Sequence, residues 1–408
     1  MRWDYYAELG YPEIGTLEDL LPVLKDMQEA HPTTPDGKPV YGLSLFKDWD
    51  GNMMVMAKQP TCFYGFDEMG FVLAQADGSE YQSIIDSDSA YVRSLKFFYE
   101  ANQMGLVDPE STTQNYDIMD AKFKAGQVLF SPWPWLGQAA FNTDEHLQAG
   151  QGFQILPMQD QRIFSYGAEA YGGKPSWLIG SQAEDPERMA AFIDWLYSVE
   201  GAYANTTQTG GTTGPEGLTW ELNADGEPEL TELGLQIMLT GDADIPEEWG
   251  GGTWDAGGSA LNVNTILSKD IDPNTGAPYS YKFWLSWQER TGNPLTDDWS
   301  AHMDGAASTM EYLEANDMIT VAPGASYAAP ADSSEIETLR NQVKAVIIQY
   351  SWQMSFAANE AEFDQLLAEM QETAIGLGYE QVYEFDLENA KAQTEARAAV
   401  VEAFEDQE

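Results

Sequence analysis

Positive charge is what this sequence has least of. Only 19 of its 408 residues are Lys or Arg, against 67 Asp or Glu, which leaves a formal net charge of -48. A field of this sign repels phosphate backbones and anionic membrane surfaces, so binding to nucleic acid or to lipid headgroups is disfavoured. Neutral or cationic ligands fit this composition better than anionic ones.

Metal ligands and thiols are equally scarce. The three histidines, His31, His146 and His302, are scattered without the spacing of a zinc site. The single cysteine, Cys62, can form no internal disulfide, and its aromatic neighbours favour a small packing residue over a nucleophile. The sequence also lacks a G-x-x-x-x-G-K-[ST] loop and a dinucleotide fingerprint. We therefore expect no metal and no cofactor.

Long apolar runs are absent as well. No stretch approaches the roughly 18–20 apolar residues that cross a bilayer. The start, Met1-Arg2-Trp3-Asp4, leads directly into foldable sequence without a signal peptide. Apolar residues nevertheless make up 43% of the chain and aromatic residues 12%, which excludes a disordered chain. A globular protein of two or three domains is expected.

Helical and extended patterns alternate, which predicts an α/β fold. Helices are expected at residues 17–30, 89–104, 186–200, 303–316, 334–356, 360–376 and 387–408. Strands are expected at residues 40–46, 127–130, 152–156 and 176–179, with turns at 35–37 and 76–78 and a hairpin at 223–226.

The most informative stretch is residues 117–137. It predicts a short helix stopped by Gly126, a buried strand at 127–130, and then Trp133 and Trp135 held apart by prolines in a loop. Ligands of α/β sheets bind beyond the carboxyl ends of the strands. We therefore expect both tryptophans to lie at a ligand site.

A third tryptophan, Trp49, follows the predicted strand 40–46 in a polar loop together with Asp48. Sugar rings present C–H faces that pack on indoles, and their hydroxyls need polar partners around the rim. Trp49, Trp133 and Trp135 therefore favour a carbohydrate ligand. Peptides and polyamines stay open, because aromatic clefts with acidic groups also suit cations.

An enzyme is the alternative class. Asp48 and Glu169, both in loops at strand ends, could form the carboxylate pair of a glycoside hydrolase. With 67 acidic residues such a pair is easy to find, and loop carboxylates more often bind ligand hydroxyls or water. No G-x-S-x-G nucleophile motif is present. A binding protein is therefore expected rather than an enzyme.

Three segments carry a family pattern in a characteristic order. They are residues 16–22, residues 121–135 with Phe-Lys-Ala-Gly followed by Pro-Trp-Pro-Trp, and residues 152–157 followed by 176–200. Together they resemble the extracellular solute-binding proteins of carbohydrate ABC transporters, of the maltose-binding-protein type. The resemblance implies a type II periplasmic-binding-protein fold, in which two α/β lobes clamp the ligand between them.

The resemblance also implies a set of ligand-binding residues. Trp133 matches the family's stacking tryptophan, and Asp48 with Trp49 match its polar-then-aromatic loop. Weaker matches lie near the crossover and in aromatic loops of the return half. The implied set is Trp133, Trp135, Asp48, Trp49, Glu169, Tyr171, Trp254 and Tyr327.

By the same resemblance, residues 1–170 are most of the second, C-terminal lobe. Residues 171–300 return to the first lobe with tryptophan-rich loops, and residues 301–408 pack back on the second lobe and end in an acidic tail. Because Met1 falls near the first crossover, the first lobe is expected to be incomplete, with exposed apolar surface. The chain then looks like a fragment without its signal or lipobox.

The family's partners and location are implied in the same way. A family member is a monomer that captures sugar outside the cell, held as a surface lipoprotein or kept in the periplasm. It delivers the sugar to the permease subunits of an ABC transporter. Contact with a membrane would be made only through a lipid anchor that this chain lacks.

Overall fold

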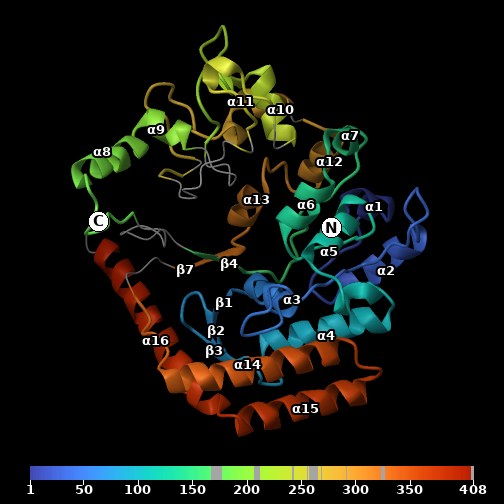
Figure 1. Cartoon of the computed structure of the whole chain (residues 1–408). Coiled ribbons are helices and arrows are strands. Elements are labelled where there is room, and N and C mark those ends of the chain that lie inside the picture. Colours follow the sequence, from blue (N-terminus) through green and yellow to red (C-terminus); the bar gives the residue numbers. More distant parts are fainter. Residues whose placement is uncertain are drawn as a thin grey trace. The chain divides into compact units, whose positions relative to one another are not determined.

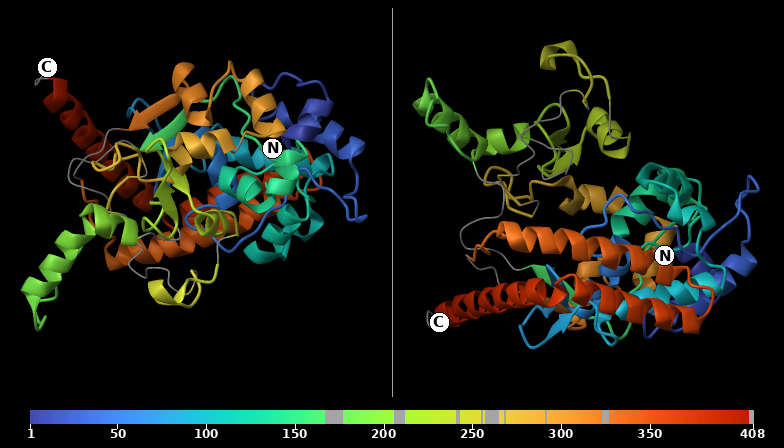
Figure 2. Two further views of the ribbon diagram at one scale, coloured as in Figure 1. Left: turned by 90° about the horizontal axis from the view of Figure 1, so that it is seen from above. Right: turned by 60° about the horizontal axis from the view of Figure 1, so that its bottom comes forward.

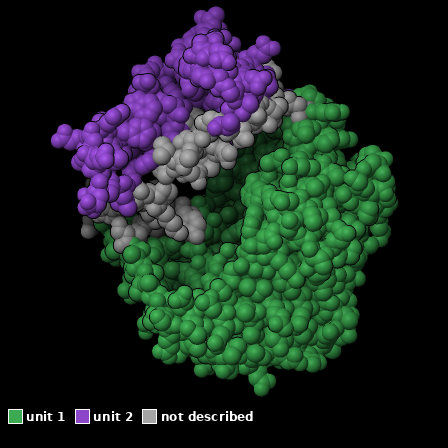
Figure 3. All heavy atoms as spheres, in the orientation of Figure 1, with its two compact units in different colours: residues 1–172, 293–408 green, residues 173–292 purple. Residues whose placement is uncertain are grey.

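The computed structural model describes residues 1–166, 177–205, 212–240, 243–254, 256, 265–267, 269–290, 292–322 and 327–405 (Figure 1). Two compact units divide the chain. Unit 1 comprises residues 1–172 and 293–408, and unit 2 comprises residues 173–292, shown in green and purple in Figure 3. Among the described residues, no helix combines the length and the apolar character needed to cross a membrane.

Helices make up most of unit 1. They are α1 (Trp3–Glu8), α2 (Leu20–Ala30), α3 (Val55–Lys58), α4 (Ala90–Gln103), α5 (Tyr116–Lys124), α6 (Pro134–Phe141), α7 (Asp144–Gln148), α12 (Pro294–His302), α13 (Thr309–Ala315), α14 (Ser334–Ser355), α15 (Glu360–Gly376) and α16 (Tyr379–Glu405), with short 3-10 helices η1 (Gln59–Tyr64) and η2 (Pro109–Thr112). The helices predicted from periodicity at 89–104, 334–356 and 360–376 are confirmed. The predicted helix at 303–316 is the shorter α13, and α16 begins well before residue 387.

Local capping explains where these helices begin and end. The Ser89 side chain accepts a hydrogen bond from the Val92 backbone N–H at the start of α4, and Gly105 with φ 71° follows its end. The helix predicted at 17–30 is wrong in its first residue. Asp19 accepts from the Gly15 and Thr16 N–H groups and holds a turn, so α2 begins only at Leu20.

The central sheet of unit 1 is reduced to isolated bridges. Tyr41 pairs with Val128 and Leu43 with Val107, both parallel, while Arg2 pairs antiparallel with Phe153. The segments 40–46, 127–130 and 152–156 therefore contain paired residues where strands were predicted. The predicted strand lengths are wrong, because each segment forms only isolated bridges. Residues 177–179 form no strand, and residue 176 of that prediction lies outside the described residues.

Two further sheets belong to unit 1. Strands β1 (Phe66–Met69), β2 (Val72–Gln75) and β3 (Tyr81–Ser83) form an antiparallel meander, with the predicted turn 76–78 between β2 and β3. Strands β4 (Ile163–Tyr166) and β7 (Ile319–Ala322) pair in parallel, with Ile163 opposite Ile319. The β4–β7 pair joins two segments that are far apart in the sequence (Figure 1).

The long C-terminal helices form one layer of unit 1. Helix α14 packs against α4, α15 and α16. The C-terminal helices are the long orange and red ribbons in the right view of Figure 2. Arg340 of α14 forms ion pairs with Asp332 (2.6 Å) and with Asp386 of α16 (2.7 Å). Asp386 also accepts a hydrogen bond from the Phe71 N–H in the β1–β2 turn (2.8 Å), which ties the meander to the helical layer.

Unit 2 is smaller and has its own aromatic core. Its elements are α8 (Pro186–Leu196), α9 (Val199–Ala204), β5 (Trp220–Leu222), β6 (Pro228–Leu230), α10 (Glu232–Thr240), η3 (Glu247–Trp249), η5 (Tyr281–Phe283) and α11 (Leu285–Arg290). The hairpin predicted at 223–226 is confirmed by the antiparallel pairing of β5 with β6. The core contains Tyr203, Trp220, Tyr279, Tyr281 and Trp284.

Helix α8 leaves most of its apolar stripe exposed. Asp185 caps it as predicted, through a hydrogen bond from the Arg188 N–H. On its apolar stripe, however, Met189 is 48% exposed and Phe192 47%, while Leu196 alone is buried. The stripe that the 3.6-residue period predicted is therefore present, but it lacks the packing surface that such a stripe normally covers.

Candidate functional site

Unit 1 contains a cavity of about 670 Å³ walled by tryptophan and aliphatic side chains. Its lining comes from η1, from the segment leading into α6, from residues 153–158, and from β4, α13 and β7. None of the described residues that line it is Asp, Glu, Lys, Arg or His. In a chain where 21% of residues are charged, this lining sets the cavity apart from the rest of the surface.

The polar groups of the cavity are amides and hydroxyls. The lining includes Gln59, Gln138, Gln154, Gln161, Ser131, Ser165 and Thr309. Gln138 donates to the Gln154 side-chain oxygen at 3.1 Å, and the Gln161 side-chain oxygen accepts from the Met158 N–H at 2.9 Å. Neutral amides can donate to and accept from hydroxyl groups, but they cannot balance a ligand charge.

The backbone after residue 130 explains why two tryptophans reach this cavity. The Phe130 N–H donates to the Gly42 carbonyl. In the tight turn that follows, the Ser131 hydroxyl donates to the Trp133 carbonyl and accepts from the Trp133 N–H. Both tryptophans were predicted to lie in a loop, and for Trp135 this is wrong. Helix α6 begins at Pro134, with Trp135 in its first turn, because proline is well tolerated at that position.

The three predicted tryptophans belong to one aromatic cluster. The Trp133 and Trp135 ring centroids are 5.8 Å apart, and Trp49 lies 6.1 and 6.0 Å from them. Phe46 supports Trp49 edge-on from the core at 4.9 Å. Trp133 is 9% exposed, whereas Trp49 and Trp135 are 46% and 44% exposed. Trp133 therefore anchors the cluster, and the other two present indole surface to solvent.

Tyr116 is a member of the cluster that sequence reasoning missed. Its ring stacks on Trp49 at 4.8 Å with an interplanar angle of 24°, and it lies 6.2 Å from Trp135. Tyr116 is the first residue of α5, directly after the Asn115 cap. An aromatic residue next to a helix cap and close to the tryptophan segment is the signal that could have found it.

Asp48 and Asp50 fix the loop that carries Trp49. The Asp48 carboxylate accepts a hydrogen bond from the Tyr116 N–H at 2.9 Å. Asp50 accepts from the Trp352 indole N–H (2.7 Å) and from the Val55 N–H (2.8 Å), and burial raises the pKa of its carboxyl. One Asp48 oxygen is thus committed to the protein.

The remaining predicted residues are dispersed. Glu169 and Tyr171 lie outside the described residues, so the Asp48–Glu169 pair has no described geometry. Tyr327 donates to Asn389 of α16 at 3.1 Å and does not line the cavity. Trp254 belongs to unit 2, where its backbone N–H donates to the Ala243 carbonyl at 2.9 Å.

Cys62 lines the cavity rather than the core. Its thiol donates to the Gln59 carbonyl at 2.9 Å, and burial raises its pKa to about 11. The group is therefore a neutral thiol near pH 7 and a poor nucleophile. Within the described part of the chain, no three His, Cys, Asp or Glu side chains gather where a metal ion could be held.

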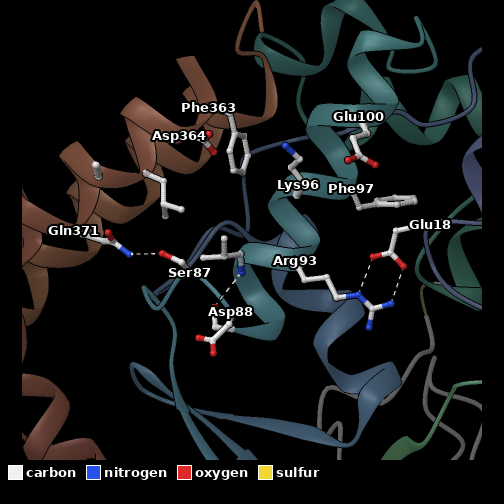
Figure 4. Close-up of a pocket in the computed structure, with 14 residues that line it drawn as sticks. Glu18, Ser87, Asp88, Arg93, Lys96, Phe97, Glu100, Phe363, Asp364 and Gln371 are labelled. Carbon is white, nitrogen blue, oxygen red and sulfur yellow. Dashed lines mark hydrogen bonds and ion pairs between the residues drawn. The ribbon is translucent and has the colours of Figure 1, made fainter. Parts of the chain in front are cut away.

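A second hollow of about 610 Å³ lies between α4 and α15 and has the opposite character (Figure 4). Charged side chains line it, and the two cations among its described lining residues are already paired. Arg93 lies 2.7 Å from Glu18, and Lys96 lies 2.7 Å from Glu360. A neutral, ring-shaped ligand suits the tryptophan-walled cavity much better than this one.

Comparison with known proteins supports the fold. No family model and no curated protein matches the sequence. Among solved structures, an HMO-binding, ABC-transporter-associated solute-binding protein from Bifidobacterium longum infantis is 12% identical with a TM-score of 0.51, covering 96% of this chain and 72% of that one. The S. pneumoniae ABC-transporter substrate-binding protein FusA, in complex with kestose, is 15% identical with a TM-score of 0.51, covering 97% and 71%.

At such low identity the likeness concerns the fold alone. The chain shares the fold of ABC-transporter solute-binding proteins, and the predicted α/β class is confirmed by its mixture of helices and short sheets.

Proposed function

We propose that this chain is the solute-binding component of an ABC importer and that it captures a neutral sugar or oligosaccharide by stacking on Trp133 and Trp135. The observation that carries the proposal is the cavity of about 670 Å³, which has tryptophan in its wall and no charged side chain among the described residues lining it. Indole faces and neutral amides match the two kinds of surface that a sugar ring presents.

The same cavity argues against the other two readings. A polyamine or charged peptide would enter it without a counter-charge, and desolvating an unpaired ionised group is expensive. Glycoside hydrolysis needs two carboxyl groups flanking the scissile bond, and the described lining supplies none. Both absences favour a neutral ligand that is bound and released unchanged.

The compared structures support the transport role. One is named as HMO-binding and another was solved with kestose, and both are ABC-transporter proteins. By this likeness, the chain would close two lobes around its sugar and deliver it to permease subunits. We place it outside the cell, as a monomer on the surface or in the periplasm.

The lobe assignment follows from the same proposal. Residues 1–170 would form most of the second lobe, residues 171–300 would return to the first, and residues 301–408 would pack back on the second. An incomplete first lobe in a type II periplasmic-binding-protein fold would account for the exposed apolar stripe of α8.

Calorimetric titration tests the proposal. The panel contains neutral sugars, namely kestose, maltotriose and fucosylated lactose, together with sialylated lactose and spermidine as charged probes. We expect at least one neutral sugar to bind and neither charged probe to do so. Trp135→Ala should weaken binding roughly 10-fold, as expected for loss of one aromatic contact.

A matched control and a contradicting result complete this test. Ile375→Ala removes a similarly exposed apolar side chain of α15 that does not line the cavity, and it should change nothing. Binding of only the charged probes, or of no member of the panel, would contradict the proposal.

A further inference from the structure

We infer that the ligand is an oligosaccharide and that Trp49 and Tyr116 form a second, outer subsite beside the Trp133–Trp135 cavity. This inference rests on the proposed function and extends it to the length of the ligand. It comes from the size of the cavity and from an aromatic surface that continues beyond the cavity's own lining.

The cavity is too large for one sugar ring. A volume of about 670 Å³ lies within the roughly 300–1,000 Å³ of pockets that bury drug-sized ligands, which are larger than a single hexose ring. A monosaccharide would therefore leave much of the space unfilled, whereas linked sugar units would occupy more of it.

The aromatic surface does not stop at the cavity wall. Trp135 lines the cavity and also contacts Trp49 at 6.0 Å and Tyr116 at 6.2 Å, although neither of these two lines the cavity. Trp49 keeps 46% of its surface exposed even though Tyr116 stacks on it. A chain of sugars leaving the cavity over Trp135 would therefore meet this pair next.

The outer pair is held in place before any ligand binds. The buried Phe46 ring supports Trp49 from the core, and the bond from the Tyr116 N–H to Asp48 joins the Trp49 loop to the start of α5. Asp48 thus acts as a positioning residue for the outer subsite. A preformed surface of this kind adds affinity without the cost of ordering flexible side chains.

The test measures affinity along a ladder of neutral sugars. Fructose, sucrose, kestose and nystose add one ring at a time, and glucose, maltose and maltotriose provide a second series. The readout is the ratio of the trisaccharide to the monosaccharide association constant within one series. In the wild-type chain we expect this ratio to exceed roughly 10, because each additional stacked ring adds binding energy.

Variants of the outer pair should lower this ratio. Trp49→Ala should reduce it roughly 2- to 12-fold, whereas Trp49→Phe should keep most of it. Asp48→Ala should reduce it as well. Asp48→Asn should restore it, because its amide oxygen can still accept from the Tyr116 N–H. This rescue separates positioning from a direct charge effect.

The outcomes separate the two proposals. If no sugar of either series binds, the proposed function falls and the outer subsite falls with it. If sugars bind but the ratio stays near one, or Trp49→Ala leaves it unchanged, the outer subsite alone is refuted. Circular dichroism of each variant shows whether a lost ratio reflects the site or the fold.

Discussion

Replacing Gly70 by alanine probes the contact that ties the β1–β2 turn to the C-terminal helices. Gly70 has φ 70°, and an added Cβ would collide with the Asp386 carboxylate. That carboxylate accepts from the Phe71 N–H and pairs with Arg340. The substitution therefore combines left-handed backbone strain with displacement of a buried ion pair.

Gly105→Ala is the matched control, because Gly105 has φ 71° but no atom within 4 Å of an added Cβ. It should cost only the backbone term of about 1–2 kcal/mol. Gly70→Ala should cost about 3–5 kcal/mol more, the loss seen when a buried pair is broken. Urea unfolding followed by circular dichroism measures both values. Equal losses in the two variants would refute the proposed role of Asp386.

Two other ion pairs give testable predictions for stability. Lys122→Met should lower the free energy of unfolding in urea by about 3–5 kcal/mol, because it leaves the fully buried Asp108 carboxylate without its cation. Glu110→Gln changes the exposed partner of the same lysine and should lower it by under about 1 kcal/mol. The hydrogen bond from the Arg93 guanidinium lowers the pKa of Glu18 below its usual 4.5, so the pair stabilises the fold above that pH and loses its effect as the pH falls through the lower folded value. The difference in unfolding free energy between wild type and Arg93→Met should therefore be constant near neutral pH and shrink below 4.5; a constant difference down to acid pH would contradict this.

Helices could be predicted because their signals are local. The 3.6-residue period and the Ser89 and Asp185 caps are local to the helices they define, and α4 appears where these signals place it. The helix predicted at 186–200 begins as expected but ends at Leu196, because Ser198 caps the separate helix α9. Strands failed for the opposite reason. Pairing of Tyr41 with Val128, or of β4 with β7, depends on contacts between distant segments, so neither the length nor the partner of a strand is written in its own residues.

The same distinction between local signals and long-range contacts applies to the candidate site. Proline spacing placed Trp133 and Trp135 just beyond the paired segment 127–130, and the structure brings Trp49 against them. The stack of Tyr116 on Trp49 could not be foreseen, and neither could the absence of charged side chains from the described lining, since both arise only when several distant segments meet. The position of Asp48 was clear, but its bond to the Tyr116 N–H was not.

Alkylation of Cys62 tests most directly whether the cavity holds the sugar. Cys62 is the single cysteine of the sequence and lines the cavity, so its reaction with iodoacetamide reports on that space. The reaction needs excess reagent and an alkaline buffer, because burial raises the pKa of the thiol to about 11 and only the thiolate reacts. We expect the neutral oligosaccharide that binds most tightly in calorimetry to slow this reaction in the wild-type chain. In Trp135→Ala the same sugar concentration should protect less. Binding seen by calorimetry with an unchanged alkylation rate would place the sugar elsewhere and contradict the account.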